Sequence, residues 1–364
     1  MNKQEIWINR KDYRQTRCVD LPQKALVEGQ VLVSIDKFAL TSNNVGYAVS
    51  GDLVGYWHYF PTHEQDWGIV GVWGLANVVA SKHPDIAVGE RISGFFPMAT
   101  DIVLQPTGIK TFQFVDGTEH RQALPPFYNQ YQRCQAEPAI MQSLENERCV
   151  LFPLYMTGFV IADFLTDNDY FSAEQVIIGS VSSKTGYSLA AFLRSNGYKG
   201  NIVGLTSNGN INFVNNLQLC DQVISYDDIE TLKQVSSVYI DMAGNSEVLA
   251  RIHQHLQDNM KSSQIVGVTH WESRGEQQQL PGCKPTFFFT PKHIKKRSDE
   301  LGATTFMEKA IMSAAGLSQQ LKSLINMEFH YGSDSVQQLW QDMLNNKVSG
   351  QRGLMLSLQD KPQK

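Results

Sequence analysis

The pattern of apolar and polar residues changes near residue 150. Before it, short runs with alternate apolar positions are separated by glycine and proline, as at 29–36, 71–80 and 86–92. A period of two residues is typical of half-buried β-strands. Residues 1–105 are therefore predicted to be rich in β-structure and to form a small barrel.

Residues 106–150 follow neither a strand nor a helix period. They are polar and turn-rich around Pro125 and Pro126, and they include Tyr128 and Tyr131. We expect an insertion or a long connection here.

From residue 151 onward, continuous apolar runs alternate with segments of helical period. A helix is predicted at 151–165, followed by a βαβ unit of about thirty residues. In this unit, strands at 176–178 and 202–205 enclose a helix that ends at Asn196-Gly197. Later apolar runs predict strands at 222–226, 237–241, 263–269 and 286–289. Strands that alternate with helices in this way predict a parallel sheet covered on both faces.

The C-terminal stretch, 306–358, again combines helices with a strand. An amphipathic helix is predicted to end near Leu324, a second helix to cover 335–345, and a strand to cover 353–356.

Residues 179–185, Gly-Ser-Val-Ser-Ser-Lys-Thr, connect the first strand of the βαβ unit to its helix. They are mostly small or carry hydroxyl groups. In a dinucleotide-binding fold this turn sets a pyrophosphate on the helix N-terminus. We therefore expect a ligand site here.

The composition excludes several classes of protein. A net charge of −5 over 364 residues gives no general attraction to nucleic acid or anionic lipid. The basic run at 292–297 is followed at once by Asp299 and Glu300, so we interpret it as a solvated helix face. The five cysteines form no Cys-x-x-Cys pair, which favours a reducing cytoplasm. No signal peptide is apparent, and no uninterrupted apolar stretch approaches the roughly 18–20 residues of a membrane span. We expect a cytoplasmic protein with neither nucleic acid nor membrane as a partner.

Several stretches resemble the medium-chain dehydrogenase/reductase superfamily. They are Gly-Gln-Val-Leu-Val-Ser-Ile from Gly29, Gly-Val-Trp-Gly-Leu-Ala-Asn-Val-Val-Ala-Ser from Gly71, Val-Gly-Glu-Arg-Ile from Val88, and the helix–turn–strand from Gly332 to Leu356, with Arg352 where a lysine is usual. The Ser-Ser-Lys-Thr turn, Trp73-Gly74 and the stretch from Phe289 to Arg297 resemble a bacterial branch of uncharacterised DUF2855-type proteins. The resemblance implies an α/β protein with a GroES-like catalytic domain and a Rossmann-type doubly wound domain. The implied domains are 1–150 (GroES-like, N-terminal part), 151–305 (nucleotide-binding) and 306–364 (return to the catalytic domain).

The chain departs from the zinc-dependent members of the superfamily. Their first zinc-binding cysteine falls here among residues 41–44, which are Thr-Ser-Asn-Asn, and no cluster of four cysteines exists. His63-Glu64 has no thiolate partner to complete a tetrahedral site, so we interpret it as structural or coincidental. The resemblance therefore implies no metal and points to the zinc-free quinone-reductase and enoyl-reductase side.

The resemblance also implies cofactor-binding residues. Ser180, Ser182 and Thr185 fall at the three glycine positions of the dinucleotide fingerprint, where a serine hydroxyl can donate to a phosphate. Ser183 lies between them, and Lys184 adds a positive charge. A degenerate loop that no longer binds a nucleotide stays an open alternative.

The end of the second strand of the doubly wound domain indicates which cofactor is bound. NAD-binding members place a carboxylate about 20 residues after the loop, to hold the ribose 2′-hydroxyl. Here Thr206, Ser207 and Asn208 can hydrogen-bond a phosphate and no carboxylate is present, which favours NADP(H). The remaining expected cofactor contacts are Thr157, Tyr226, Met242, Ala243, Gly244, Val268 and Thr269. Asp241 could contact a ligand or cap the turn that follows it.

Hydride transfer needs orientation and a proton donor rather than a protein nucleophile. Asn43 and Asn44 fall where zinc-free members often place an asparagine near the nicotinamide. Tyr47 and Tyr56 are candidate proton donors, although aromatic residues beside glycines more often pack than catalyse. Residues 57–60, Trp-His-Tyr-Phe, could wall an apolar pocket.

These observations predict a zinc-independent, NADPH-dependent oxidoreductase acting on a quinone, an enone or a carbonyl compound. The apolar segment 286–290 is expected to be the edge strand through which two copies pair. One alternative is a non-catalytic nucleotide-binding protein that keeps the fold. A P-loop triphosphatase is a minor alternative, because its motif needs glycines where this chain has Ile178 and Ser183.

Overall fold

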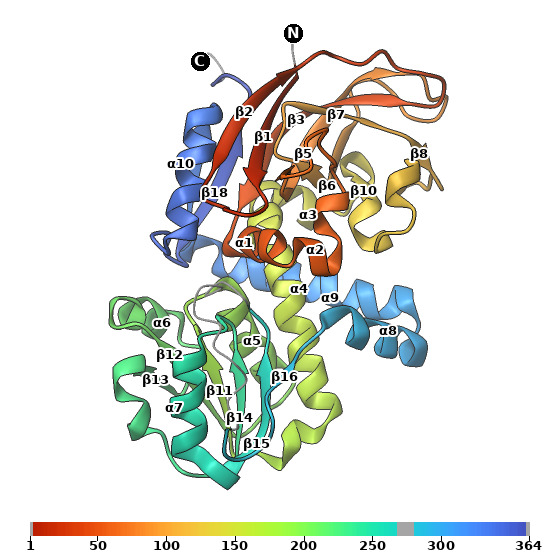
Figure 1. The fold of residues 1–364 in the computed structure, drawn as a ribbon. Coiled ribbons are helices and arrows are strands. Elements are labelled where there is room, and N and C mark those ends of the chain that lie inside the picture. The colour runs from red at the N-terminus through yellow and green to blue at the C-terminus, as the bar shows by residue number, and fades with distance from the viewer. Residues whose placement is uncertain (1–2, 268–279, 362–364) are drawn as a thin grey trace. The chain divides into compact units, whose positions relative to one another are not determined.

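The computed structural model describes residues 3–267 and 280–361. The chain forms two compact units (Figure 1). Unit 1 comprises Met1–Val150, Asn326–Val348 and Arg352–Lys364, and unit 2 comprises Leu151–Ile325 and Ser349–Gln351. The chain therefore returns to unit 1 at Asn326, whereas the sequence placed this return at 306.

Unit 1 contains two β-sheets. The larger has the order β17-β18-β3-β5-β6-β10-β9-β8, with β7 paired to β3, and the smaller has the order β2-β1-β4. The strands are β1 (Lys3–Asn9), β2 (Thr16–Leu21), β3 (Val31–Leu40), β4 (Trp67–Gly68), β5 (Gly71–Ser81), β6 (Arg91–Pro97), β7 (Asp101–Leu104), β8 (Pro106–Thr107), β9 (Gln113–Asp116), β10 (Gln130–Arg133), β17 (Asn326–Tyr331) and β18 (Arg352–Ser357). The helices are α1 (Ser42–Val49), α2 (Gly51–Val54), α3 (Ala139–Ser143) and α10 (Ser333–Leu344).

The first strands follow the sequence pattern. Val31, Val33 and Ile35 are buried while the residues between them are half-buried, as the period of two requires. The strand expected at 86–92 is wrong for most of its length, because β6 begins only at Arg91. Gly89 adopts a positive φ of 90° in a turn, and this ends the extended run before β6 starts.

Residues 106–150 are not a mere connection, because β8, β9 and β10 extend the larger sheet. Arg121 holds this region together from inside. Its side chain is 1% exposed, and it donates to Asp116 at 2.7 Å, to the Asn129 side chain at 3.0 Å and to the Tyr131 hydroxyl at 3.1 Å. A buried cation is stable only with such partners, and here the partners are the polar residues that made the sequence look like a loop.

Unit 2 is built on one parallel sheet with the order β13-β12-β11-β14-β15-β16, and β13 and β16 form its two edges (Figure 1). In chain order this is 3-2-1-4-5-6, the doubly wound arrangement. The strands are β11 (Gln175–Gly179), β12 (Asn201–Thr206), β13 (Gln222–Ser225), β14 (Ser237–Asp241), β15 (Met260–Ile265) and β16 (Thr286–Phe287). The helices are α4 (Glu145–Asp167), which begins in unit 1, α5 (Lys184–Ser195), α6 (Ile211–Leu217), α7 (Ser246–Leu256), α8 (Thr290–Leu301) and α9 (Ala303–Leu321).

Apolar side chains join the sheet of unit 2 to its helices. Ile177, Val203 and Tyr239 belong to a buried cluster that also contains Leu249 and Ile252 of α7. Burial of this kind is the main force that holds a helix on a sheet.

The helices α4, α5 and α9 also pack on one another. The ring of Phe159 on α4 lies 5.7 Å from that of Phe192 on α5 and 5.8 Å from that of Phe306 on α9. Because α9 packs here, it belongs to unit 2 and does not begin the return to unit 1.

Among the described residues, α4 is the one helix long and apolar enough to span a membrane, although charged residues interrupt its apolar run. However, 67% of its most apolar window is buried inside the protein. Core helices of globular proteins meet the same criterion, and the contacts of Phe159 identify α4 as one of them.

The basic run at 292–297 lies on α8. Lys295 and Lys296 are exposed, as expected for a solvated face, and they pair with Asp299 and Glu300. The same helix also presents His293 and Arg297 to α4, where His293 Nε2 lies 2.8 Å from Asp163 Oδ2.

Candidate nucleotide-binding site

The loop at 179–185 lies at the carboxyl end of β11, next to β14. Strand order reverses between these two strands, and ligands of doubly wound sheets bind at this point. Ser180 has a positive φ of 51°, so it makes the tight turn usually left to glycine. Ser183 caps α5, its hydroxyl accepting a hydrogen bond from the Gly186 backbone at 3.1 Å. The helix therefore begins at Lys184 with its amide groups directed at the loop.

Gly186, rather than Thr185, is the glycine that permits close packing. A Cβ on Gly186 would lie 2.7 Å from the Ser180 carbonyl oxygen and 2.8 Å from the Val181 Cα. The loop backbone can therefore fold against α5 only because this position has no side chain. The aligned fingerprint missed Gly186 by one residue, although a glycine in the first turn of a predicted helix was visible in the sequence.

Lys184 is buried, at 8% exposure, and its ammonium donates to the Gly350 carbonyl oxygen at 2.9 Å. Burial lowers the pKa of this lysine to about 8. Gly350 lies in the short segment of unit 2, Ser349–Gln351, and a Cβ there would stand 1.9 Å from the Ser182 carbonyl oxygen. Lys184 therefore connects Ser349–Gln351 to the loop at 179–185, in addition to placing a positive charge in that loop. The sequence did not predict this connecting role.

The three polar residues at the end of β12 and just after it already have partners. Thr206 donates to the Ser182 hydroxyl at 3.0 Å, and Ser207 accepts from the Asn210 amide at 3.0 Å. Asn208 donates through Nδ2 to Asp227 Oδ2 at 2.6 Å. A carboxylate therefore does lie beside this turn, although the sequence had indicated none. It belongs to Asp227, which follows the neighbouring strand β13.

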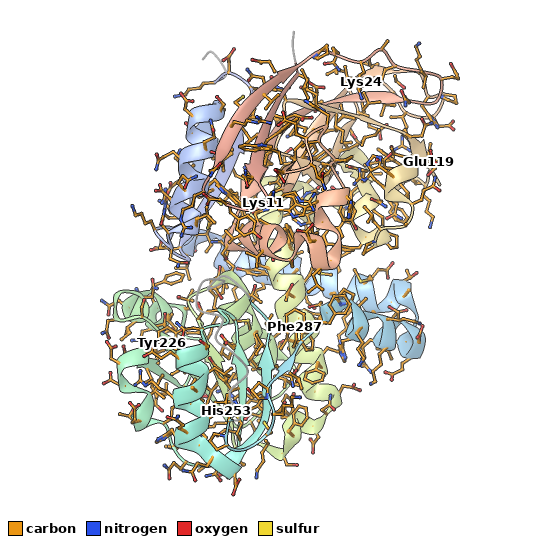
Figure 2. All side chains as sticks on the ribbon, in the orientation of Figure 1. Lys11, Lys24, Glu119, Tyr226, His253 and Phe287 are labelled. Carbon is orange, nitrogen blue, oxygen red and sulfur yellow. The ribbon has the colours of Figure 1, made fainter. Side chains whose placement is uncertain are left out.

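Tyr226 directly follows β13, and its side chain contacts the loop at 179–185. Its hydroxyl oxygen accepts a hydrogen bond from the Ser180 backbone at 2.6 Å, and burial raises its pKa to about 12, so it is neutral at physiological pH. Figure 2 shows Tyr226 beside this end of the sheet, while His253, on α7, lies farther from it.

The ends of the next strands match the capping alternative for Asp241. Its Oδ1 accepts hydrogen bonds from the backbone of Ala243 and of Gly244, each at 2.9 Å. Met242 and Ala243 are buried behind this turn. Val268 and Thr269 lie outside the described residues.

Thr157 lies on α4, and its hydroxyl donates to the Pro153 carbonyl oxygen of the same helix at 3.0 Å. The next residue, Gly158, brings α4 close to α5, since a Cβ there would lie 2.2 Å from the Ser188 hydroxyl.

In unit 1, Asn44 has a structural role. It is 2% exposed, its Oδ1 accepts from the Thr41 backbone at 2.7 Å, and its Nδ2 donates to the Gly71 carbonyl oxygen at 2.9 Å. These contacts cap α1 and tie it to β5. Asn43 is half-buried, and its side chain acts to lower the pKa of Tyr47, against the larger effect of burial.

Tyr47 and Tyr56 meet a third tyrosine that the sequence analysis had not assigned to the site. The hydroxyl of Tyr128 lies 3.0 Å from that of Tyr56, and the ring of Tyr128 lies 6.1 Å from that of Tyr47. Trp73 donates to the Tyr47 hydroxyl at 3.3 Å. Burial raises the pKa of all three tyrosines, so each keeps its proton at neutral pH. Tyr128 comes from the polar region 106–150, whose place in the sheet the sequence did not show.

The expected wall at 57–60 is only partly available to a ligand. Tyr59 and Phe60 are buried and pack on Phe95, with ring centroids 5.6 and 5.7 Å apart. Trp57 is also buried, whereas His58 is exposed. A cavity of about 210 Å³ in unit 1, lined by residues that include Arg91, Cys134 and Arg148, involves none of the candidate residues.

Within the described ranges, no three His, Cys, Asp or Glu side chains are grouped to hold a metal ion. His63 and Glu64 contact each other at 3.8 Å, and His63 packs edge-on against Trp7 at 4.8 Å. These contacts fit the structural interpretation of the pair.

The family described as "Protein of unknown function (DUF2855)" matches residues 38–349. No curated protein matches the chain. Among solved structures, CurA from Vibrio vulnificus in complex with NADPH is 13% identical, with a TM-score of 0.61 over 99% of this chain and 100% of that chain. The yhdH oxidoreductase from Salmonella enterica in complex with NADP is 13% identical, with a TM-score of 0.53 over 98% and 100%.

The quinone oxidoreductase from Coxiella burnetii is 12% identical, with a TM-score of 0.52 over 99% of this chain and 100% of that chain. At such identities the likeness shows the fold. It confirms the α/β class with a GroES-like β-rich part and a Rossmann-type sheet. The resemblance to DUF2855-type proteins is confirmed by the family match.

Proposed function

The chain belongs to the DUF2855 family, and from its fold and the loop at 179–185 we propose that it is a zinc-independent, NADPH-dependent oxidoreductase. Its substrate is a small molecule with an activated carbonyl group or carbon–carbon double bond, such as a quinone, an enone or an aldehyde. We also propose that 1–150 with the C-terminal return forms the catalytic part and that the parallel-sheet unit binds the nucleotide.

The observation that carries the proposal is the shape of the loop. Ser180 makes a left-handed turn, Gly186 lets the backbone pack on α5, and the amides of the first helical turn are directed at the loop. These are the features that a pyrophosphate needs at a strand–helix junction. The hydroxyl groups of Ser182 and Ser183 and the ammonium of Lys184 fit a phosphate ligand by charge and hydrogen-bonding capacity. Two solved structures of the same fold hold NADPH or NADP.

When bound, the reduced nicotinamide supplies a hydride, and the substrate must then receive a proton. The tyrosine cluster of unit 1 (Tyr47, Tyr56 and Tyr128) is the proposed source of hydrogen bonds and of that proton. Its hydroxyls are neutral, those of Tyr56 and Tyr128 are hydrogen-bonded to each other, and the rings pack together, so the hydroxyls can donate to an oxygen atom that gains negative charge. The indole of Trp73 donates to the hydroxyl of Tyr47 in this cluster at 3.3 Å.

The direct test is oxidation of NADPH by the purified protein with a panel of quinones, enones and aldehydes, followed by loss of nicotinamide absorbance. If the cluster donates, Tyr56→Phe should lower kcat by about 10²-fold, the size of a general-acid contribution, with little change in stability. Tyr331→Phe, on β17 of the same unit, is the matched control and should keep full activity. Binding of NADPH without turnover of any acceptor would favour the alternative of a non-catalytic nucleotide-binding protein.

We further propose a cytoplasmic homodimer that pairs through β16. This strand is an edge of the parallel sheet, and Phe287 and Phe289 are 59% and 47% exposed there. An exposed apolar edge favours pairing with a second copy. Light scattering should give a dimer for the wild type and for Leu301→Lys, a control at another exposed apolar residue, but a monomer for Phe287→Lys. A wild-type monomer at micromolar concentration would contradict this proposal.

A further inference from the structure

Strand register brings Asp227 to the turn that would hold the adenosine ribose. β12 and β13 are parallel neighbours, and Thr206 pairs with Ser225. Asn208 and Asp227 each lie two residues beyond this last pair, in the turns that follow the two strands, and are therefore side by side at the end of the sheet. Their side chains meet through the 2.6 Å hydrogen bond from Asn208 Nδ2 to Asp227 Oδ2.

The backbone fixes the position of Asp227. Ser225 is buried at 2% exposure, and its hydroxyl accepts a hydrogen bond from the Asp227 amide at 3.2 Å. This caps the short helix that starts at Tyr226, and Tyr226 in turn is bonded to the loop at Ser180. The carboxylate is thus held at the edge of the candidate site, with its charge exposed to solvent.

Arg251, a basic side chain that contacts this turn at Tyr226, already has partners. Arg251 of α7 donates to the Tyr226 carbonyl oxygen at 2.9 Å and pairs with both carboxylate oxygens of Glu230, at 2.9 Å each. Arg251 and Glu230 together add no net charge. The charge beside Asn208 is therefore the negative charge of Asp227.

This arrangement affects how well the turn accepts a 2′-phosphate or a 2′-hydroxyl on the adenosine ribose. In doubly wound domains the end of the second strand receives the adenosine ribose, where a carboxylate can accept a hydrogen bond from a 2′-hydroxyl. A 2′-phosphate bound by Asn208 would instead lie next to a second anion. Like charges at such short range disfavour binding.

We propose that Asp227 is a specificity-determining residue for the nucleotide, which favours the 2′-hydroxyl of NADH and penalises the 2′-phosphate of NADPH. The inference rests on the proposed function, since it assumes that the site binds a nicotinamide dinucleotide. It adds that the wild-type protein binds NADPH and NADH with affinities of the same order, because Asp227 offsets the phosphate-binding groups of the turn.

The test is calorimetric titration of the wild type, Asp227→Asn and Asp228→Asn with NADPH and with NADH, repeated with the fragments 2′,5′-ADP and 5′-AMP. Asparagine has nearly the same shape and can still accept from Asn208. Asp227→Asn should raise affinity for NADPH and 2′,5′-ADP about tenfold, which is about 1.4 kcal/mol. Affinity for NADH and 5′-AMP should stay the same or fall. Asp228→Asn removes the same charge one residue away and should change neither.

An equal change for both nucleotides in Asp227→Asn, or no change for either, would overturn the role of Asp227 and leave the proposed function intact. Equal gains in Asp228→Asn would show a general effect of charge and would also overturn it. A wild-type protein that binds neither nucleotide nor fragment would refute the proposed function itself, and the inference with it.

Discussion

Replacement of Gly186 by alanine tests whether the loop is packed as the structure shows. In a helix, alanine is more favourable than glycine by up to about 1 kcal/mol. Against this gain stands the new methyl group, which would lie 2.7 Å from the Ser180 oxygen and 2.8 Å from the Val181 Cα. Both are backbone atoms, so relief requires the loop itself to move, and overpacking of this kind costs about 1–3 kcal/mol. Gly186→Ala is therefore expected to lower the free energy of unfolding by up to about 2 kcal/mol.

Gly316, on α9 of the same unit, provides the control. A Cβ there meets nothing within 4 Å, so Gly316→Ala should gain only the helix preference. Both variants gain the helix preference of alanine, so the difference between their free energies of unfolding leaves only the packing cost of about 1–3 kcal/mol. Thermal unfolding followed by circular dichroism should separate them by at least about 2–4 °C. NADPH affinity should fall about tenfold in Gly186→Ala alone, because the loop has shifted. Equal stability of the two variants, with unchanged NADPH binding, would refute the packing described for the loop.

Two further predictions follow from buried charges in unit 2. Because the pKa of Lys184 falls from 10.5 to about 8 on burial, the unfolded chain binds the extra proton between these values. Denaturation at several pH values should therefore show that the free energy of unfolding of the wild type, relative to that of Lys184→Met, rises between about pH 8 and 10.5. A difference that does not change with pH would contradict the lowered pKa of Lys184. Asp163→Ala should cost about 3 kcal/mol in urea denaturation, because it leaves the buried His293 without its carboxylate partner on α4 and removes one of the carboxylates that pair with Arg297. Asp299→Ala, which breaks an exposed pair with Lys295, should cost less than about 0.5 kcal/mol, and similar losses in the two variants would contradict the burial argument.

The elements of unit 2 could be predicted because their signals are local. Continuous apolar runs marked β11, β12, β13 and β14 to within a residue or two, and Asn196-Gly197 marked the end of α5. β17 was missed because it alternates weakly, with no residue of Asn326–Tyr331 fully buried. β17 forms because it pairs in parallel with β18. The two segments are far apart in the chain, so local sequence patterns do not indicate this pairing.

The sequence predicted the part of the site whose residues are consecutive in the chain, but not the parts that distant segments bring together. The turn at 179–185 was visible, but Asp227 was not, since its meeting with Asn208 depends on the register of β12 against β13. Tyr128 was missed for a similar reason. Arg121 binds its backbone carbonyl and the side chain of Asp116, and such contacts between polar residues leave no periodic pattern in the sequence. In both cases polar side chains are specified by tertiary hydrogen bonds, whereas the sequence pattern reports apolar burial.

The central claim is that the loop at 179–185 binds a nicotinamide dinucleotide. The most direct measurement is a titration of the wild-type protein with NADPH, followed by tryptophan quenching and repeated with Lys184→Ala. We expect a Kd in the micromolar range for the wild type and a loss of about tenfold or more in the variant. Absence of NADPH and NADH binding to a folded wild-type protein would contradict it.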